Sequence, residues 1–400
     1  MKLTFDQIKK IAVGTVEIAE NDGILYFYRS TAKQREVWKG MAGNSSGSTG
    51  VRLDFHTNSR KVVFNAPYGG KFELYIDGLL RKQYPADRDK SEPIVAEAKG
   101  VIGEELDEYR VTLYFPNHDE GGAISSVEVD DGAFVRPHDF DIKMLFIGDS
   151  ITQGWESKYD TLAYAQRVSM FFNADSVIQG IGGIYFRISA YDKIDYEPDA
   201  VIISLGTNDF NHFPTLDDMR VQVSGFLDLL CEDFSDKKVF IISPIWRALK
   251  SEESYARFAA CRDVVISEAE KRGLIHIDGL TLMPPIPALF ADKVLHPNDL
   301  GFSLYSENLI KSLQKSGVVL ATYIHMYSLT STQDLKCGDM NIDGKVDLTD
   351  LTELSLSLIG DKDLSFIPDN VSDTTKDGNT NLADLARLKQ YISLDITSFD

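Results

Sequence analysis

The stretch Lys143–Trp155, "KMLFIGDSITQGW", joins an apolar run to a Gly-Asp-Ser sequence and decides how the centre of the chain is interpreted. The run "MLFI" has no polar residue on either face, which is typical of a strand that is buried on both sides. The residues after Ser150 are expected to begin a helix, with the serine hydroxyl exposed. Because loops meet at the carboxyl ends of parallel strands, Ser150 is predicted to lie at the edge where reactive groups gather.

The residues that follow repeat this pattern of buried strands and helices. The short apolar runs are "DSVIQG", "DAVIISLG", "KKVFIISP" and "GLIHIDG". The helical stretches are "LDDMRVQVSGFLDLLCEDF", "SYARFAACRDVVISEAEKRG" and "NDLGFSLYSENLIKSLQKSG". Apolar strands that alternate with helices predict a parallel sheet with helices on both faces, here over residues 139–320.

The chain before this region has a different pattern. Segments such as "GVRLDFHTN", "KFELYIDG" and "YRVTLYFP" alternate polar and apolar residues and are separated by Gly, Asn and Asp. This spacing predicts an antiparallel β-sandwich over residues 1–138. In "YIDGLLRKQY" the Asp-Gly pair predicts a tight hairpin, since such turns need residues with positive φ.

The C-terminal region contains an internal repeat. The sequence "GDMNIDGKVDLTDLTELSLSLIG" is followed 34 positions later by "SDTTKDGNTNLADLARLKQYI". A duplicated segment of this length predicts a separate small domain over residues 335–400. A linker over residues 321–334 is expected to join it to the parallel-sheet domain.

Composition argues against several classes of protein. The net charge of -20 argues against a nucleic-acid partner, because binding phosphates requires a basic face. No apolar stretch approaches the roughly 20 residues that span a bilayer, so no membrane partner is expected. The N-terminus has no clean apolar signal core, so an export signal is expected to be missing from this sequence. The cysteines Cys231, Cys261 and Cys337 are too few and too scattered for a disulfide framework.

The polar residues at the predicted strand ends are those that ester chemistry needs. A serine becomes a nucleophile when an imidazole within hydrogen-bond distance takes its proton, and Ser150 and His296 are the candidates. The tetrahedral intermediate of acyl transfer needs donors aimed at its oxyanion. The backbone N–H groups of Ser150 and Gly180 and the side-chain amide of Asn208 are the candidates for that oxyanion hole.

Four short sequences carry a resemblance to a known family. In chain order, "GDSITQG", "GIGG", "GTND" and "HPND" resemble the four blocks of the SGNH or GDSL hydrolases, over residues 140–317. The resemblance implies a flavodoxin-like α/β/α domain and a serine esterase mechanism that uses no catalytic cofactor. It implies that Ser150 is the nucleophile and His296 the base, with Gly180 and Asn208 in the oxyanion hole. The preceding sandwich resembles the N-terminal jelly roll of two-domain carbohydrate esterases.

One position departs from the family pattern. The family usually places the triad aspartate three residues before the histidine, but that residue is Lys293, and Asp292 stands four before His296. Asp292 could orient the imidazole through an adjusted loop, which would complete a triad. A backbone carbonyl could do so instead, which would leave a Ser-His dyad. Both arrangements stay open at this point.

The C-terminal repeats place acidic and amide residues at the spacing of calcium-binding loops. Such loops supply oxygen atoms from positions 1, 3, 5, 7, 9 and 12, with glycine at position 6. The predicted ligands of the first ion are Asp339, Asn341, Asp343, the Lys345 carbonyl, Asp347 and Asp350. Those of the second are Asp373, Thr375, Asp377, the Asn379 carbonyl, Asn381 and Asp384. We expect two calcium ions, with weaker binding in the second loop because Thr375 offers a hydroxyl.

Each loop is expected to lead into one amphipathic helix. The apolar stripes are Leu351, Leu354 and Leu358 in the first repeat and Leu385, Leu388 and Ile392 in the second. No helix is expected before either loop. A tandem of loop and helix resembles a dockerin, which implies a cohesin module of a scaffoldin as partner and a cellulosome as location. The recognition positions of that family are Leu348-Thr349 and Leu382-Ala383 here, without its common Ser-Thr pair.

Together these expectations indicate a secreted, extracellular esterase that is attached to a cellulosome. Its predicted substrate is an acetylated hemicellulose such as xylan or mannan, from which it would remove acetyl groups. One alternative is a feruloyl or general short-chain esterase. Another, of a different class, is a catalytically inactive carbohydrate-binding protein attached to the scaffold.

Overall fold

The computed structural model describes residues 1–42, 45–100, 103–117, 121–318, 336–340, 345–360 and 369–399. The chain divides into two compact units, Met1–Leu320 and Ala321–Asp400. The predicted boundary near residue 138 lies inside the first unit, so a separate sandwich domain stays a prediction. Within the described part of the chain, every helix is too short or too polar to cross a membrane.

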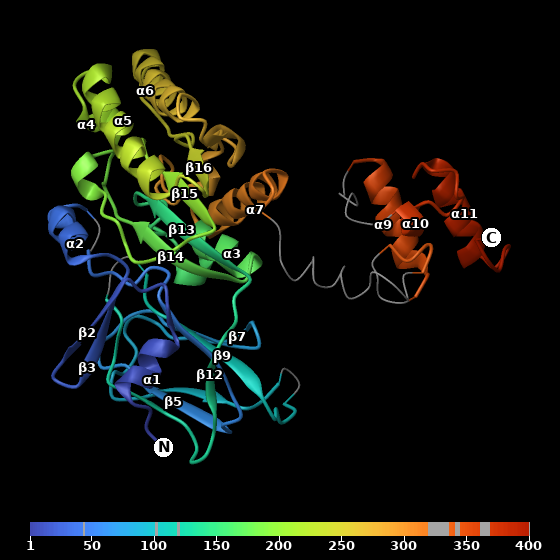
Figure 1. Cartoon of the computed structure of the whole chain (residues 1–400), viewed down its shortest axis with the longest axis horizontal. Helices are drawn as coiled ribbons and strands as arrows, with labels where there is room; N and C mark the ends of the chain where they lie inside the picture. Colours follow the sequence, from blue (N-terminus) through green and yellow to red (C-terminus); the bar gives the residue numbers. More distant parts are fainter. Residues whose placement is uncertain are drawn as a thin grey trace. The chain divides into compact units, whose positions relative to one another are not determined.

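A five-stranded parallel sheet forms the centre of the first unit (Figure 1). Its strands are β13 (Ile142–Gly148), β14 (Ala174–Gly180), β15 (Ala200–Ser204), β16 (Lys238–Ile242) and β17 (Ile275–Ile277). They pair in the order β14-β13-β15-β16-β17. This is the order of flavodoxin-like folds, and ligands of such sheets bind where the order reverses, beside the first strand. The parallel α/β prediction is confirmed.

Helices cover both faces of this sheet. The helices are α3 (Tyr164–Phe171), α5 (Leu216–Asp233), α6 (Glu252–Glu270) and α7 (Asp299–Lys315). Leu145 and Ile147 of β13 belong to the buried cluster that includes residues of α5 and α6. Met144 and Phe146 belong to the cluster that includes residues of α3 and α7. Successive side chains of one strand therefore enter two different cores, which explains the continuous apolar run.

The first 137 residues form antiparallel sheets. One sheet has β1 (Ala12–Val13), β4 (Arg52–Thr57), β9 (Tyr109–Tyr114), β6 (Glu73–Ile76) and β7 (Leu79–Gln83), with β12 (Val135–Pro137) on β4. The others are β10 (Ala123–Ile124), β3 (Ile24–Tyr28) and β2 (Glu17–Asn21), and β11 (Ser126–Glu128), β5 (Lys61–Asn65) and β8 (Ile94–Glu97). Asp77 and Gly78 have φ values of 50° and 75°, which confirms the predicted hairpin. The jelly-roll arrangement stays a prediction.

Two short helices interrupt these strands, α1 (Phe5–Lys10) and α2 (Ala32–Trp38). Both begin with a capping box, in which a threonine side chain and a glutamine three residues later accept each other's backbone N–H groups. Neither helix was predicted from the sequence. Figure 1 shows α2 beside the parallel sheet, apart from β2 and β3.

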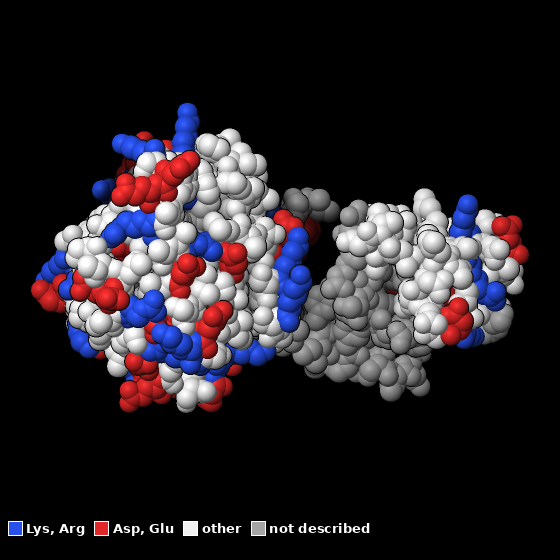
Figure 2. All heavy atoms as spheres, turned by 90° about the horizontal axis from the view of Figure 1, so that it is seen from above, with Lys and Arg blue, Asp and Glu red and all other residues white. Residues whose placement is uncertain are grey.

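Figure 2 shows how charged side chains are distributed on one face of the molecule. On the part of that face formed by residues 1–320, basic and acidic groups are mixed, and no continuous basic surface is visible.

The second unit contains α9 (Leu348–Leu358), α10 (Asp369–Ser372) and α11 (Leu382–Ile392). Met340, Leu354, Val371 and Leu388 form its buried core, and the remaining residues of both predicted stripes pack against them. The expectation of no helix before either loop is wrong for the second loop, because α10 directly precedes Asp373. A helix of four residues is too short to produce a hydrophobic period in the sequence.

Candidate active site

Ser150 lies two residues beyond the end of β13. The turns from Ser150 to Glu156 replace the helix that the sequence predicted. The Gln153 N–H donates to the Asp149 carbonyl at 2.9 Å, which closes a single helical turn. Gly154 and Glu156 then adopt positive φ values of 79° and 72°, and this left-handed backbone prevents a helix from continuing. Ser150 is only 4% exposed, so the expectation of an exposed hydroxyl was also wrong.

The side chains of Ser150, His296 and Asp292 form a hydrogen-bonded chain. Ser150 Oγ is 2.9 Å from His296 Nε2. His296 Nδ1 is 2.8 Å from Asp292 Oδ2. The tautomer that serves both bonds carries its proton on Nδ1, which leaves Nε2 free to accept the serine proton.

The loop that carries Asp292 and His296 accommodates one additional residue. Lys293 has a φ of 59°, a left-handed conformation that is uncommon for a residue with a side chain. Asp292 Oδ1 accepts the N–H groups of Val294 at 2.8 Å, Leu295 at 2.8 Å and His296 at 3.2 Å. The loop therefore winds around one carboxylate oxygen, which leaves the other oxygen for the imidazole.

The Asp292 carboxyl is held in its ionised form. Burial acts to raise its pKa, but hydrogen bonds from the Leu295 and Val294 N–H groups and from His296 outweigh burial. The pKa of Asp292 therefore lies below its ordinary value. Of the two arrangements that the sequence left open, the geometry corresponds to the adjusted loop.

Besides the Ser150 N–H, the proposed oxyanion donors belong to the two strands beside β13: Gly180 ends β14, and Asn208 lies in the loop after β15. Gly148 pairs with Gly180 on β14 and with Ser204 on β15, so the loops after these residues leave the sheet at one edge. A Cβ atom on Gly180 would lie 2.3 Å from the Gln153 backbone nitrogen. Only glycine allows this close approach to the turn that carries Ser150.

Asn208 lies at the end of the loop after β15 and precedes α4 (Asp209–His212). Its Nδ2 donates one hydrogen to the Ile184 carbonyl at 2.8 Å, which fixes the orientation of the amide. The amide group carries two hydrogens, so one donor remains for an oxyanion.

Two buried carboxyl groups support these loops. Asp149 and Asp209 are 2% and 0% exposed, and burial raises the pKa of each to about 7. Asp149 Oδ1 accepts the Ile151 N–H at 2.9 Å, and Asp209 accepts the Phe186 N–H at 3.2 Å. These bonds hold the turn after β13 and the loop after β14. The structural part of Asp209 was not predicted from the sequence.

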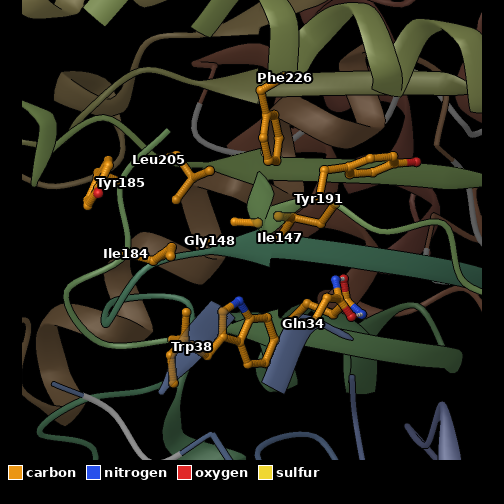
Figure 3. A pocket seen from close by; sticks show the side chains of 12 residues that line it. Gln34, Trp38, Ile147, Gly148, Ile184, Tyr185, Tyr191, Leu205 and Phe226 are labelled. Atoms are coloured by element: carbon orange, nitrogen blue, oxygen red, sulfur yellow. Dashed lines mark hydrogen bonds between the residues drawn. The ribbon is translucent and has the colours of Figure 1, made fainter. Parts of the chain in front are cut away.

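Helix α2 packs against the strands that carry the candidate site, where its Gln34 contacts Gln179 of β14. Gln34 and Gln179 exchange amide hydrogen bonds, each at 3.0 Å. Figure 3 shows Gln34 and Trp38 of α2 across a small cavity from Ile147 and Gly148 of β13. The cavity has a volume of about 20 Å³, enough for roughly one water molecule and too little for a substrate. This cavity is therefore a packing detail of the sheet.

Two parts of the chain match known protein families. Residues 146–304 match the GDSL-like Lipase/Acylhydrolase family, and residues 337–393 match the dockerin type I domain. The chain carries a GDSL-like hydrolase domain and a C-terminal dockerin type I domain. A search of curated protein sequences finds no significant match.

Solved structures with the same fold include enzymes of different activities. The salicylyl-acyltransferase SsfX3 from a tetracycline biosynthetic pathway is 18% identical, with a TM-score of 0.65 over 77% of this chain and 95% of that chain. A family 2 carbohydrate esterase with a carbohydrate binding domain from Corynascus thermopiles (Myceliophthora fergusii) is 17% identical, with a TM-score of 0.55 over 73% and 99%. A family two carbohydrate esterase from Clostridium thermocellum in complex with cellohexaose is 17% identical, with a TM-score of 0.50 over 73% and 98%.

These likenesses concern the fold, because sequence identity is low. The structures cover 77% and 73% of this chain, which is more than the segment from residue 146 to the C-terminus contains. The similarity therefore extends into the antiparallel sheets that precede the hydrolase domain.

In the second loop of the dockerin domain, the predicted ligand residues form hydrogen bonds within the loop. Asp373 Oδ2 accepts the Gly378 N–H at 2.7 Å, and Asp384 Oδ2 accepts the Asn381 N–H at 2.7 Å. Thr375 Oγ1 lies 2.8 Å from Asp384 Oδ1 and 3.2 Å from Asp373 Oδ1, so the first and last ligand positions approach one hydroxyl. The carboxylates are 8% and 0% exposed, and a buried pair of this kind fits a cation.

The first loop is described in part. Asn341 and Asp343 lie outside the described residues. Asp350 Oδ2 accepts the Asp347 N–H at 2.8 Å, which matches the arrangement of Asp384 and Asn381 in the second loop. Among the described residues, no three His, Cys, Asp or Glu side chains are grouped closely enough to mark a metal site. The number of calcium ions therefore stays a prediction.

Proposed function

We propose that the chain is a serine carbohydrate esterase that removes acetyl groups from a plant cell-wall polysaccharide such as xylan or mannan. The observation that carries the proposal is the chain of hydrogen bonds from Ser150 through His296 to Asp292. It lies in a GDSL-like hydrolase domain, a class of domain whose members hydrolyse esters.

In the first half of the reaction, Ser150 Oγ attacks the acetyl carbonyl carbon while His296 Nε2 takes the hydroxyl proton. Asp292 stabilises the imidazolium that forms. The carbonyl oxygen becomes an oxyanion, which accepts hydrogen bonds from the Ser150 and Gly180 N–H groups and the remaining Asn208 amide hydrogen. The intermediate collapses, His296 returns its proton to the sugar oxygen, and the sugar hydroxyl leaves.

In the second half, water replaces the sugar. His296 Nε2 takes a proton from the water, and the hydroxide attacks the acetyl group on Ser150. Collapse of this second intermediate releases acetic acid and returns the proton to Ser150 Oγ. No step requires a cofactor.

The sugar substrate is proposed from the similar solved structures and from the dockerin domain on the same chain. Two of the solved structures with this fold are family 2 carbohydrate esterases, one of them in complex with cellohexaose. The dockerin domain supports attachment to a cohesin module and, through it, an extracellular place on a polysaccharide-degrading complex. Acetyl groups on hemicellulose are the esters that such a complex meets most often.

Calcium belongs to the dockerin part of the proposal. The proposed ligands are the oxygen atoms of Asp339, Asn341, Asp343, Lys345, Asp347 and Asp350 in one loop, and of Asp373, Thr375, Asp377, Asn379, Asn381 and Asp384 in the other. Bound calcium compensates the repulsion among these carboxylates and thereby stabilises the folded loops.

The test of the proposed function is acetate release from acetylated xylan and mannan by the full chain. Ser150→Ala is expected to lower the rate at least about 1000-fold, while the exposed control Ser235→Ala keeps the wild-type rate. Equal rates for Ser150→Ala and wild type would refute the esterase. Faster release of ferulate or butyrate than of acetate from matched substrates would favour the feruloyl or short-chain alternative.

A further inference from the structure

Two hollows of the surface adjoin each other beside Asn208. The first, of about 380 Å³, is lined by Asn208, Asn211 and Gly183 of the hydrolase domain and by the segment 40–42 that follows α2. The second, of about 520 Å³, is lined by residues that include Arg187, Ser189 and Gln222. Tyr185 and His212 line both hollows. The two side chains therefore form a ridge where one hollow meets the other.

The ridge is a fixed aromatic surface. The rings of Tyr185 and His212 are stacked, with centroids 3.5 Å apart and planes inclined by 20°. Phe213 meets Tyr185 edge-on at 5.5 Å and His212 edge-on at 5.0 Å. Three mutually packed rings lose little conformational freedom when a ligand binds, so they suit the apolar faces of sugar rings.

The second hollow offers hydrogen-bond donors and no carboxylate among the described residues that line it. Gln222 Oε1 accepts the Ile188 N–H at 3.0 Å, so the Nε2 amide group is its part that can donate to a ligand. The Arg187 guanidinium lies 5.8 Å from the Tyr185 ring centroid. A cation and an amide beside aromatic rings suit hydroxyl-rich ligands, and they do not suit a long acyl chain.

Both hollows are large enough for a sugar ring. A cavity of roughly 150 Å³ holds a benzene molecule, and each hollow exceeds that volume more than twofold. The first hollow contains Asn208, which the proposed mechanism places on the oxyanion. A sugar in this hollow therefore lies beside the reacting ester, and its neighbour in a chain lies across the ridge.

We propose that the two hollows are adjacent sugar subsites, so the enzyme acts on acetylated chains of two or more sugars in preference to acetylated monosaccharides. This inference rests on the proposed function. The acetylated sugar occupies the hollow at Asn208, and the next sugar occupies the hollow at Arg187 and Gln222. Only a substrate of two or more sugars reaches the second hollow. Its contacts there raise kcat/KM for the oligosaccharide and not for the monosaccharide.

The test compares acetate release from singly acetylated xylose and from a singly acetylated xylo-oligosaccharide, and the same pair built on mannose. We expect kcat/KM of the wild-type enzyme to be about tenfold higher for the oligosaccharide. The variant Arg187→Ala/Gln222→Ala is expected to bring the ratio of the two kcat/KM values close to one. Arg187→Ala alone is expected to lower the ratio in part. Arg60→Ala, at an exposed arginine between β4 and β5, is the matched control and keeps the wild-type ratio.

The ratio is measured within each variant, so a general loss of activity does not affect it. A wild-type ratio near one, or a double variant with the wild-type ratio, overturns the subsites. If Ser150→Ala abolishes turnover in that same experiment, the proposed function stands without them. If neither sugar ester is hydrolysed, or if Ser150→Ala has no effect, the proposed function fails and the subsites fail with it.

Discussion

Replacement of Asp292 by asparagine separates the two tasks of this side chain. Its Oδ1 accepts three backbone N–H groups of the loop, and its Oδ2 accepts His296 Nδ1. In Asp292→Asn, the amide oxygen must stay with the three N–H groups, because turning the amide would abandon all of them. The NH₂ group then faces His296 Nδ1 and forces the imidazole proton onto Nε2. An imidazole in that tautomer cannot accept the proton of Ser150.

The expected loss follows from the charge that the substitution removes. Two unit charges about 4 Å apart interact by about 4 kcal/mol at an effective dielectric constant near 20. The side chains of His296 and Asp292 are 21% and 34% exposed, so solvent screening reduces this to about 3 kcal/mol. A barrier higher by that amount corresponds to a loss of kcat of about 100-fold. The unfavourable tautomer adds to this loss.

The assay is acetate release under saturating substrate, together with thermal unfolding of the same protein. We expect kcat of Asp292→Asn to fall at least about 100-fold, with little change in KM, because the substrate does not contact Asp292. The melting temperature is expected to stay near that of the wild type, since the loop keeps its three hydrogen bonds. Asp236→Asn, at an exposed aspartate that forms an ion pair with its neighbour Lys237, is the control.

A loss of kcat below threefold, with an unchanged melting temperature, would refute this reasoning. It would mean that Asp292 serves only to shape the loop and that Ser150 and His296 act as a dyad. The dyad is the other arrangement that the sequence left open.

Three further predictions concern other parts of the chain. Gly180→Ala is expected to lower the melting temperature and to reduce activity more than tenfold, because the new Cβ would lie 2.3 Å from the Gln153 nitrogen. Unchanged unfolding curves would contradict this. Asp209→Asn is expected to stabilise the protein more at pH 8 than at pH 5. Burial raises the pKa of Asp209 to about 7, so the folded state binds more protons than the unfolded state between about pH 4 and pH 7. The stability of the wild type therefore falls as pH rises through that window. A stability difference between variant and wild type that does not change with pH would count against this reasoning. Removal of calcium with a chelator is expected to abolish binding to a cohesin while sparing acetate release, and binding that survives chelation would contradict the proposed role of the ion.

The sheet of the hydrolase domain was predictable because its strands are buried on both faces. A strand of this kind must be apolar throughout, so the five runs from "KMLFIG" to "GLIHIDG" stand out from the helices between them. Helix α2 was not predictable in the same way. Its buried residues are Gln34 and Trp38, and the glutamine is buried through its amide exchange with Gln179. A polar buried position leaves no apolar period in the sequence.

The candidate site was predictable to the extent that its residues follow strand ends. Ser150 and Asn208 follow β13 and β15, and Gly180 ends β14, so the topology of the sheet brings all three to one edge. The hollow beside Asn208 was not predictable, because the segment 40–42 reaches it from the N-terminal half of the chain. The segment 40–42 and Asn208 are more than 160 positions apart, and no local sequence pattern predicts that they line one hollow.

The loop before His296 shows how a motif with one additional residue keeps its geometry. A catalytic histidine needs a hydrogen-bond acceptor at Nδ1. The backbone between the aspartate and the histidine sets the distance between the carboxylate oxygen and Nδ1. With Lys293 in a left-handed conformation, the chain turns back on itself within the isolated bridge between Phe290 and Pro297. The Ala291 N–H donates to the His296 carbonyl at 2.8 Å and closes this turn. Asp292 stands four residues before His296, and the left-handed Lys293 lets the loop turn so that Asp292 Oδ2 lies 2.8 Å from the imidazole Nδ1.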